Sequence, residues 1–196
     1  RGITNEDLIP EEIRALTVSR SGYAKTQPLE EYREQRRGGQ GKAAATVKEE
    51  DLIQNLYVLS SHVQILCFTT KGKVYWLKVY EIPVASRTSK GRPLVNMLNL
   101  DDDERVSDIL PVEEFSDKKF IFMATRKGIT KKTNLSLFER KWKSGIKAIN
   151  LDEDDKLIGT AITDGTNEIL LASSAGKLIR FKESKVRAMG RTARGV

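Results

Sequence analysis

Short apolar runs recur along the chain, and each ends at a glycine turn. They are rich in β-branched, aromatic and aliphatic residues and occupy residues 13–18, 64–68, 119–124 and 168–172. Runs of this kind, bounded by turn residues, predict the first strand of a β-hairpin. The fully apolar runs predict strands that are buried on both faces. A second strand-like run leaves each turn, most clearly at residues 72–79.

The turn glycines mark an internal repeat. They are Gly22, Gly72, Gly128 and Gly176, at spacings of 50, 56 and 48 residues. A second glycine follows each of them at offsets of 19, 19, 17 and 19 residues, at Gly41, Gly91, Gly145 and Gly195. Two coupled periods of this kind indicate a repeat architecture.

Each repeat has room for four strands. After the second glycine comes a short strand-like run such as 147–151, then an acidic turn such as 152–155, then a last run such as 156–162. Four strands in a unit of this length are typical of a propeller blade. The sequence therefore predicts an all-β, propeller-like repeat of four-stranded blades.

The repeat also predicts the domain organisation. Residues 1–12 are a polar lead-in linker, and residues 13–196 form one domain. Its blades are expected at approximately 13–63, 64–118, 119–166 and 167–196. The sequence stops just after the second glycine of the last repeat, so we expect three complete blades and a partial fourth, as in a segment of a longer domain.

Composition fits a folded chain with a polyanionic partner. The 196 residues include 39% hydrophobic residues and only 5 prolines, and the formal net charge is +7. The one cysteine, Cys67, lies in an apolar run and predicts a buried, reduced thiol in a cytoplasmic protein. No apolar stretch reaches the ~18–20 residues of a membrane span, and the first residues do not resemble a signal peptide.

Charge is segregated by position within the repeat. Windows 19–42, 71–92, 126–147 and 177–194 hold 27 of the 34 Lys and Arg but only 6 of the 27 Asp and Glu, a net charge of +21. The other 110 residues carry −14. Because repeats stack in the same orientation, equivalent positions are expected to line up as a basic stripe. Duplex DNA, with one charge per ~1.7 Å, is the polyanion that suits such a stripe.

One glycine-rich loop stands out within the stripe. Glycines allow close approach to a phosphate, exposed amides donate to it, and arginines bind it bidentately. The candidate DNA-binding residues of this loop are Gln35, Arg36, Arg37, Gly38, Gly39, Gln40, Gly41 and Lys42. Further DNA contacts are expected from the equivalent windows, at Arg87, Lys90, Arg92, Lys131, Lys132, Arg140, Lys141, Lys143, Lys147, Arg187, Arg191 and Arg194.

The loop carries a family resemblance. Residues 35–41, Gln-Arg-Arg-Gly-Gly-Gln-Gly, closely resemble the Gln-Arg-Arg-Gly-Gly-Lys-Gly box of the C-terminal domain of bacterial DNA gyrase A. The preceding residues 28–34 are similar to the segment that leads into that box. Similar stretches follow at 65–68, 78–80, 91–93, 109–111, 122–125 and 186–190. The related topoisomerase IV protein lacks an intact box.

The resemblance implies a fold and a role. The fold is a β-pinwheel, in which neighbouring four-stranded blades exchange a strand. The role is to bend duplex DNA into a right-handed wrap, so that gyrase introduces negative supercoils. Expected partners are double-stranded DNA and, in the parent heterotetramer, the rest of the gyrase A polypeptide and the gyrase B polypeptide. Gln40 stands in place of the usual lysine, so we expect weaker wrapping.

No catalytic or metal-binding set is recognisable. His62 is the only histidine and has no Cys or His at ligand spacing. The acidic turn at 101–104 is expected to be a solvated face that repels phosphate, and Trp76 and Trp142 are expected to anchor the core or a loop. No nucleotide-binding glycine motif occurs. We expect no enzymatic activity and no cofactor in this chain, and ATP and Mg only in the parent enzyme, a topoisomerase of the isomerase class.

The sequence is also compatible with other functions. One alternative is a DNA-binding repeat domain like that of topoisomerase IV. Another is a protein-binding propeller, which the lack of recurring Gly-His or Trp-Asp pairs and the basic stripe disfavour. A third is a propeller enzyme, which would need acid, base or metal groups converging at the axis.

Overall fold

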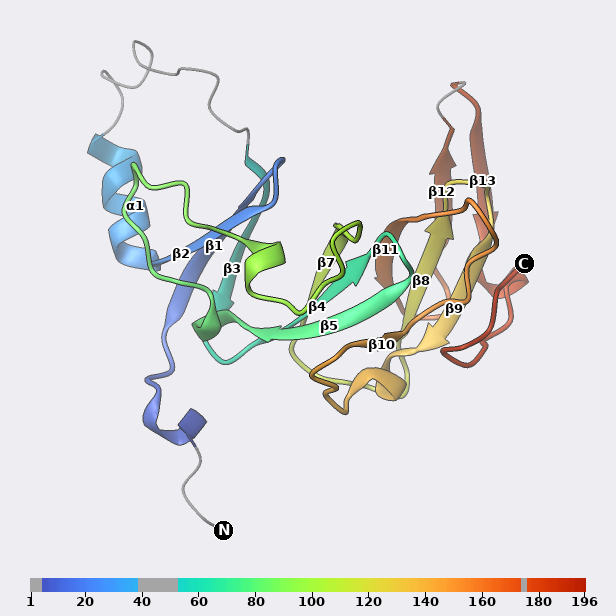
Figure 1. Cartoon of the computed structure of the whole chain (residues 1–196), viewed down its shortest axis with the longest axis horizontal. Helices are drawn as coiled ribbons and strands as arrows, with labels where there is room; N and C mark the ends of the chain where they lie inside the picture. Colours follow the sequence, from blue (N-terminus) through green and yellow to red (C-terminus); the bar gives the residue numbers. More distant parts are fainter. Residues whose placement is uncertain (1–4, 39–52, 174–175) are drawn as a thin grey trace. The chain divides into compact units, whose positions relative to one another are not determined.

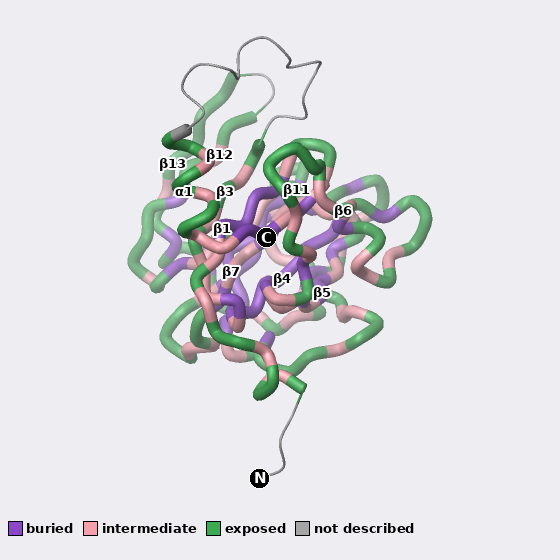
Figure 2. The backbone as a smooth tube through the Cα atoms, turned by 90° about the vertical axis from the view of Figure 1, so that its left-hand side faces the viewer, coloured by how far each residue is buried: buried purple, intermediate pink, exposed green. Residues whose placement is uncertain are grey.

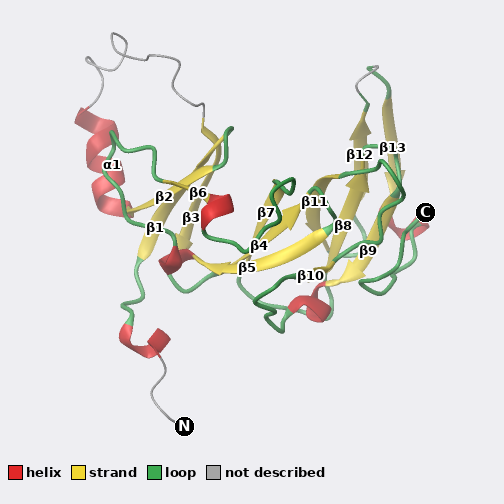
Figure 3. Ribbon diagram, viewed as in Figure 1, coloured by secondary structure: helices red, strands yellow, loops and turns green. Residues whose placement is uncertain are grey.

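The computed structural model describes residues 5–38, 53–173 and 176–196. In these residues strands dominate (Figure 1, Figure 3), and the other elements are one α-helix and several 3-10 turns. In chain order the elements are η1 (Asn5–Leu8), β1 (Ile13–Ser19), β2 (Tyr23–Pro28), α1 (Leu29–Gly38), β3 (Ile53–Ser60), β4 (Gln64–Thr69), β5 (Lys73–Lys78), η2 (Val79–Glu81), β6 (Arg92–Pro93), η3 (Leu94–Asn96), β7 (Val106–Val112), β8 (Phe120–Thr125), β9 (Thr130–Asn134), η4 (Leu135–Phe138), β10 (Ile146–Lys147), β11 (Leu157–Thr163), β12 (Glu168–Ala172), β13 (Leu178–Lys182) and η5 (Glu183–Lys185).

The chain divides into two compact units. Unit 1 comprises Arg1–Ile65 and Leu77–Leu100, and unit 2 comprises Leu66–Trp76 and Asp101–Val196. Unit 1 holds one sheet with the strand order β3-β1-β2-β6. Unit 2 holds the sheets β11-β8-β9 and β12-β13 and most of the sheet β10-β5-β4-β7. The first two residues of β4 and the last two residues of β5 belong to unit 1. The β1–β2, β4–β5, β8–β9 and β12–β13 segments are the four predicted hairpin repeats, and the predicted all-β class is confirmed.

A sheet is completed by a short strand from the following repeat. β6 follows the second hairpin in sequence, but it pairs with β2 of the first sheet, where Ala24 lies opposite Arg92. In the same way β10, which follows the third hairpin, pairs with β5, where Val74 lies opposite Ile146. This is the strand exchange that the family resemblance implies.

A third exchange involves the last residue. Val196 and Thr130 of β9 exchange two backbone hydrogen bonds, at 2.7 and 2.9 Å. The glycine before an exchanged strand is held very close to the receiving sheet: a Cβ on Gly91 would lie 2.3 Å from the carbonyl oxygen of Ala24. Gly91 also has a φ of +84°. The second glycine period therefore marks the point where one repeat enters the sheet of another.

The core of unit 2 joins β4, β5, β7, β8 and η4. Every residue of β4 is buried, as the apolar run predicts (Figure 2). The cluster consists of Leu66, Phe68, Val74, Val112, Ile121, Met123, Leu135, Phe138, Ala148, Ile149 and Leu157. Cys67 is buried in β4, and burial raises the pKa of its thiol to about 12. The thiol is therefore uncharged at neutral pH.

The structure corrects the prediction for β12. Its run is as apolar as the others, yet Leu170 is 60% exposed, and Leu178 and Ile179 of the paired β13 are also exposed. Ile169 is the residue of β12 that is buried, against Phe122 and Val186. This hairpin is a two-stranded sheet, so hydrophobic sequence alone did not bury it.

The acidic turns are also not simply solvated. Glu104, the last residue of the 101–104 turn, is fully buried. It accepts hydrogen bonds from the Thr69 hydroxyl (2.5 Å), the Tyr75 hydroxyl (3.3 Å) and the Asp101 amide (3.2 Å). The equivalent Asp155 is buried too. Each carboxylate therefore ties its turn to the adjacent hairpin, while the preceding acids of both turns remain largely exposed.

The described part of the predicted lead-in belongs to unit 1 and packs against other residues of that unit. Glu6 pairs with Lys78 (3.3 Å), the Ser61 hydroxyl donates to the carbonyl of Pro10 (2.9 Å), and His62 Nε2 lies 2.8 Å from the carbonyl of Ile9. In the described part of the chain no helix is long and apolar enough to span a membrane.

Candidate nucleic-acid interface

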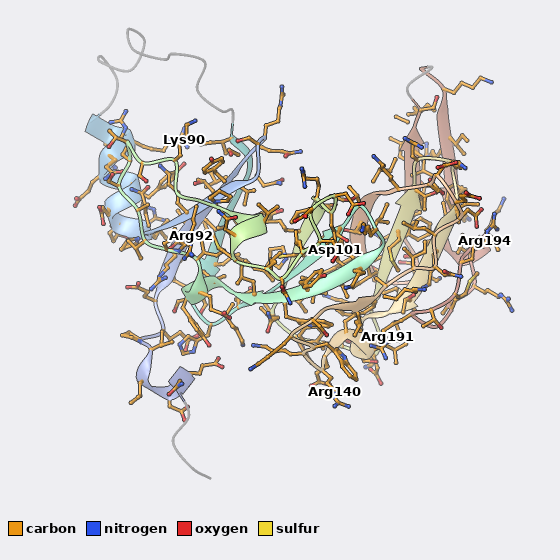
Figure 4. The ribbon with its side chains drawn as sticks, in the orientation of Figure 1. Lys90, Arg92, Asp101, Arg140, Arg191 and Arg194 are labelled. Carbon is orange, nitrogen blue, oxygen red and sulfur yellow. The ribbon has the colours of Figure 1, made fainter. Side chains whose placement is uncertain are left out.

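The predicted basic positions gather in three equivalent loops and on α1. We call the three segments the basic loops: loop 86–92, loop 139–147 and loop 187–194. Each follows the 3-10 turn after a second strand, namely η2, η4 and η5. Figure 4 marks Lys90 and Arg92 in unit 1 and Arg140, Arg191 and Arg194 in unit 2.

Loop 86–92 is fixed by a lysine of the neighbouring strand. The Lys25 ammonium donates to the carbonyl oxygens of Ser86 (3.1 Å), Arg87 (3.0 Å) and Ser89 (2.8 Å). The side chains of Arg87 and Lys90 are exposed, and Lys90 Nζ lies 5.7 Å from the centre of the Tyr23 ring. The loop thus holds its carbonyls toward Lys25 and presents its cations to solvent.

A shallow pocket lies beside this loop. Its volume is about 240 Å³, and its wall includes Ser19 and Tyr23 from the β1–β2 turn and Arg87, Ser89 and Lys90 from the loop. Lys25 also lines this pocket. Three cations and two serine hydroxyls at one pocket form a suitable environment for a phosphate group.

Loop 139–147 is organised around Trp142. The Arg140 guanidinium lies 4.2 Å from the centre of the indole ring, and the amide of Gly145 donates to the carbonyl of Trp142 (2.9 Å). Lys73 donates to the carbonyl of Ser144 (3.1 Å). The partly buried Trp142 therefore anchors the loop, as the sequence predicts, while Arg140 remains exposed.

Trp76 has the other predicted anchoring role. Its indole N–H donates to the carbonyl of Phe138 at the end of η4 (2.9 Å), and its ring packs against the core of unit 2.

Loop 187–194 carries three arginines, and one of them forms an ion pair. Arg194 makes a two-pronged ion pair with Asp152 (2.5 and 2.6 Å), and this contact lowers the pKa of Asp152 and raises that of Arg194. The carbonyl of Arg191 accepts a hydrogen bond from Lys131 (2.6 Å). Arg187 is exposed.

Two predicted DNA contacts lie inside the protein instead. Lys131 is fully buried, and its ammonium donates to the carbonyls of Ala148 and Arg191 (both 2.6 Å). Lys132 is 6% exposed, lies 3.7 Å from the Glu183 carboxylate and points over the Phe120 ring at 4.7 Å. Neither ammonium is available to a phosphate, so these two residues are not part of the exposed basic surface.

The box is helical where the structure describes it. Gln35, Arg36, Arg37 and Gly38 form the last turn of α1 rather than a glycine loop. Arg36 and Arg37 are exposed, and Arg36 donates to the Tyr32 hydroxyl (3.3 Å). Cations in the last turn of a helix complement its dipole. Gly39, Gln40, Gly41 and Lys42 lie outside the described residues.

The remaining predicted cations lie on the basic loops, and all of them are exposed. They are Arg92, Lys141, Lys143 and Lys147. Sequence reasoning missed Lys25 and Lys73, which hold loop backbones. The repeat could have drawn attention to Lys25, because Lys25 and Lys131 occupy the same repeat position, three residues after the turn glycine. In residues 5–38, 53–173 and 176–196, no three His, Cys, Asp or Glu side chains come together as a metal site would require.

Sheets that exchange a strand with the next repeat, together with a basic loop in successive repeats, define a propeller-type repeat domain with a cationic loop surface. The chain belongs to the DNA gyrase C-terminal domain family. The family model described as "DNA gyrase C-terminal domain, beta-propeller" matches residues 15–60, 64–113, 119–164 and 167–196.

Individual relatives agree with this assignment. The chain is 53% identical over 194 residues to the DNA gyrase A protein of Salmonella typhimurium, covering 99% of this chain and 22% of that protein. It is 54% identical over 187 residues to the DNA gyrase A protein of Aeromonas salmonicida, covering 95% and 20%. The chain thus spans about a fifth of the length of these relatives.

Solved structures match the fold. A C-terminal domain of DNA topoisomerase IV superposes with a TM-score of 0.81 at 28% identity, covering 96% of this chain and 57% of that one. A DNA gyrase A C-terminal domain gives a TM-score of 0.66 at 20% identity, covering 94% and 59%.

Proposed function

We propose that this chain binds duplex DNA through its basic loops and bends it, as the wrapping module of a DNA gyrase A protein. The observation that carries the proposal is the recurrence of exposed Arg and Lys on the same loop of successive repeats. Chance surface charge would not recur at one repeat position. Phosphates along a duplex recur regularly, and neutralising them releases counterions that drive association.

The proposed contacts are the loop cations whose side chains reach solvent and the end of α1. They are Arg36, Arg37, Arg87, Lys90, Arg92, Arg140, Lys141, Lys143, Lys147, Arg187, Arg191 and Arg194. These cations lie on loops and at the end of one helix, where they can meet the DNA backbone. Because the proposal places no recognition helix in the major groove, binding should depend little on base sequence. Easily bent DNA should bind better than stiff DNA.

In this proposal the chain is a non-catalytic part of a larger enzyme. It acts with the rest of the gyrase A polypeptide and with gyrase B in a cytoplasmic heterotetramer, and a right-handed wrap leads to negative supercoiling. The chain needs no cofactor of its own, whereas ATP and Mg act in the parent enzyme. The buried, uncharged thiol of Cys67 suits a reducing compartment.

Salt-dependent binding tests the proposal directly. The chain is titrated with short and long duplexes of several sequences between 50 and 200 mM salt (about the range over which phosphate contacts weaken binding steeply). We expect log K to fall linearly with log salt, with a slope of about −0.9 per neutralised phosphate, and long duplexes to bind more tightly. Binding that is independent of salt, or confined to one short sequence, would reject the proposal.

The box has a separate part in this function. Bending 20–30 bp by 40–90° costs about 1–6 kcal/mol, so the ends of the bend need strong contacts. We propose that Arg36 and Arg37 fasten one end. Replacing both with alanine should abolish the change in plasmid linking number while much of the simple binding remains. Gln40→Lys should strengthen the wrap. A double-alanine variant that still shifts linking number like the parent would move this role to another loop.

A further inference from the structure

Two lysines of the basic windows make the same contact in different repeats. Lys25 on β2 donates to the carbonyl of Arg87, and Lys131 on β9 donates to the carbonyl of Arg191. Each lysine lies three residues after the turn glycine of its repeat, and each arginine lies four residues before the second glycine of a later repeat. The contact is therefore a repeated feature of the fold, and it joins one repeat to the basic loop of another.

A related contact occurs in the repeat between these two, where a lysine of β5 reaches loop 139–147. The position three residues after Gly72 is Tyr75, and Lys73 lies two residues earlier on the same strand. Side chains two apart on a strand point to the same face. Lys73 accordingly reaches the carbonyl of Ser144 in loop 139–147 (3.1 Å). All three basic loops thus receive an ammonium group from the face of a second strand.

A lysine ammonium is well suited to bind several backbone carbonyls at once. A lysine ammonium has three donors and no acceptor, and Lys25 directs hydrogen bonds to three carbonyls of loop 86–92, at 2.8, 3.0 and 3.1 Å. Hydrogen bonds inside the loop span only a few residues: the Ser89 amide donates to the carbonyl of Ser86, and the Gly91 amide donates to the Ser89 hydroxyl (both 3.1 Å). The lysine therefore determines which way the loop carbonyls face.

Burial separates Lys131 from the exposed loop cations. Lys131 is fully buried and Lys25 is partly buried, whereas Arg87 and Lys90 are exposed. Desolvation lowers the pKa of Lys131 to about 8, with a smaller contribution from Arg191. The buried Lys131 ammonium cannot reach a phosphate. The Lys25 ammonium is more exposed, but its hydrogen bonds to three carbonyls direct it to the loop backbone.

We propose that Lys25 and Lys131 are positioning residues for DNA binding: each holds the basic loop of a later repeat so that the arginine and lysine side chains of that loop face the duplex. This inference rests on the proposed function for its DNA readout. It predicts that a repeat binds DNA well only when the lysine that supports its loop is in place.

A double-mutant cycle on loop 86–92 tests the proposal. Lys25→Met keeps the aliphatic stem and removes the donors. Lys71→Met is the matched control, because it removes one charge at a lysine that pairs with Asp101 and Asp103, outside the basic loops. Arg87→Ala/Lys90→Ala removes the proposed phosphate contacts of the loop directly.

The expected result is a loss of binding that depends on the loop cations. Lys25→Met should weaken duplex binding roughly 5- to 30-fold at 0.15 M salt, and it should reduce the salt slope as the loss of about two contacts does. In the Arg87→Ala/Lys90→Ala background it should change binding less than about twofold, because coupled residues are not additive. Lys71→Met should leave the slope nearly unchanged. Fully additive effects, or equal effects of the two lysine variants, would overturn the proposal.

A measurement on the unaltered chain covers the case in which a variant does not fold. The ammonium protons of Lys25 and Lys131 should exchange slowly with solvent, whereas those of the exposed Lys71 should exchange quickly. Fast exchange at both supporting lysines overturns the proposal. If the unaltered chain shows no salt-dependent DNA binding, the proposed function fails. The positioning role is then still decided by whether Lys25→Met speeds amide exchange in loop 86–92 without DNA.

Discussion

The β4–β5 and β12–β13 hairpins of unit 2 occupy the same place in two repeats, yet they are buried to very different extents. Every residue of β4 is buried, while β12 and β13 leave Leu170, Leu178 and Ile179 at least 58% exposed. β4–β5 is flanked in its own sheet by β7 and β10, and it packs into the core with β8. β12–β13 is a two-stranded sheet.

Burial in this repeat fold therefore comes from neighbouring elements rather than from the apolar sequence of one hairpin. In stacked repeats, stability is close to a sum of the terms within each repeat and the contacts between neighbours. Matched substitutions at equivalent positions of the two hairpins should therefore have unequal effects.

The largest difference is expected from truncation of apolar side chains. Leu66 of β4 and Leu170 of β12 each lie six residues before the turn glycine of their repeat. Leu66 is fully buried in the core of unit 2, so Leu66→Ala should lower the free energy of unfolding by about 2–5 kcal/mol. Leu170→Ala on β12 should lower it by less than about 1 kcal/mol, because the side chain is largely in water. Urea denaturation followed by circular dichroism measures both, and similar losses would contradict the comparison.

The turn glycines should give a smaller difference. Gly72 and Gly176 have nearly the same φ, +76° and +78°, so alanine is strained at both, by about 1–2 kcal/mol. At Gly72, however, the added Cβ would lie 2.8 Å from the carbonyl oxygen of Ile149, whereas at Gly176 it would meet nothing within 4 Å. Gly72→Ala should therefore lower the free energy of unfolding by about 2–4 kcal/mol, including the backbone strain. Equal changes in Tm for the two variants would show that the neighbouring Ile149 yields freely.

Much of the fold could be predicted from the two glycine periods. They located the four hairpins and, through Gly91 and its equivalents, the entry points of the exchanged strands. The hydrophobic and polar pattern could not predict which sheet a two-residue strand joins. Alternation of apolar and polar residues indicates which face of a strand is buried, but it does not identify the strand that pairs with it. The strand exchange came from the family resemblance instead.

Helix α1 was not predicted, although the charges of its own residues favour a helix. Residues 29–38 carry Glu30 and Glu31 in the first turn and Arg36 and Arg37 in the last, an arrangement that complements the helix dipole. The repeat pattern and the glycines at the end of the segment favoured a loop, and the box was therefore predicted without its helical part.

The candidate site was predicted only in part, because counting charge treats every lysine alike. Arg87, Lys90 and Arg140 lie on exposed loops, as expected. Lys131 lies on a strand, where its long aliphatic stem can be buried while its ammonium finds carbonyls. Distinguishing the two kinds of cation requires the three-dimensional partner of each one, which the sequence does not contain.

The smallest expected effect again compares a buried and an exposed position, and it depends on pH. Lys131 is buried on β9, and Lys177 is exposed just before β13. The pKa of Lys131 is about 8 in the folded chain and about 10.4 when unfolded. Between these values the unfolded chain binds more protons, so the contribution of Lys131 to stability rises with pH.

Lys131→Met isolates that contribution. The quantity to compare is the free energy of unfolding of the parent minus that of the Lys131→Met variant. This difference should increase by up to about 2 kcal/mol between pH 8 and 10, and it should not change with pH below pH 7. Subtraction removes the titration of other groups, including Tyr75, whose pKa burial raises. The same difference for Lys177→Met should stay within about 0.5 kcal/mol, as for most surface positions. A falling difference for Lys131 would mean that its hydrogen bonds to Ala148 and Arg191 favour the ammonium more strongly than burial disfavours it.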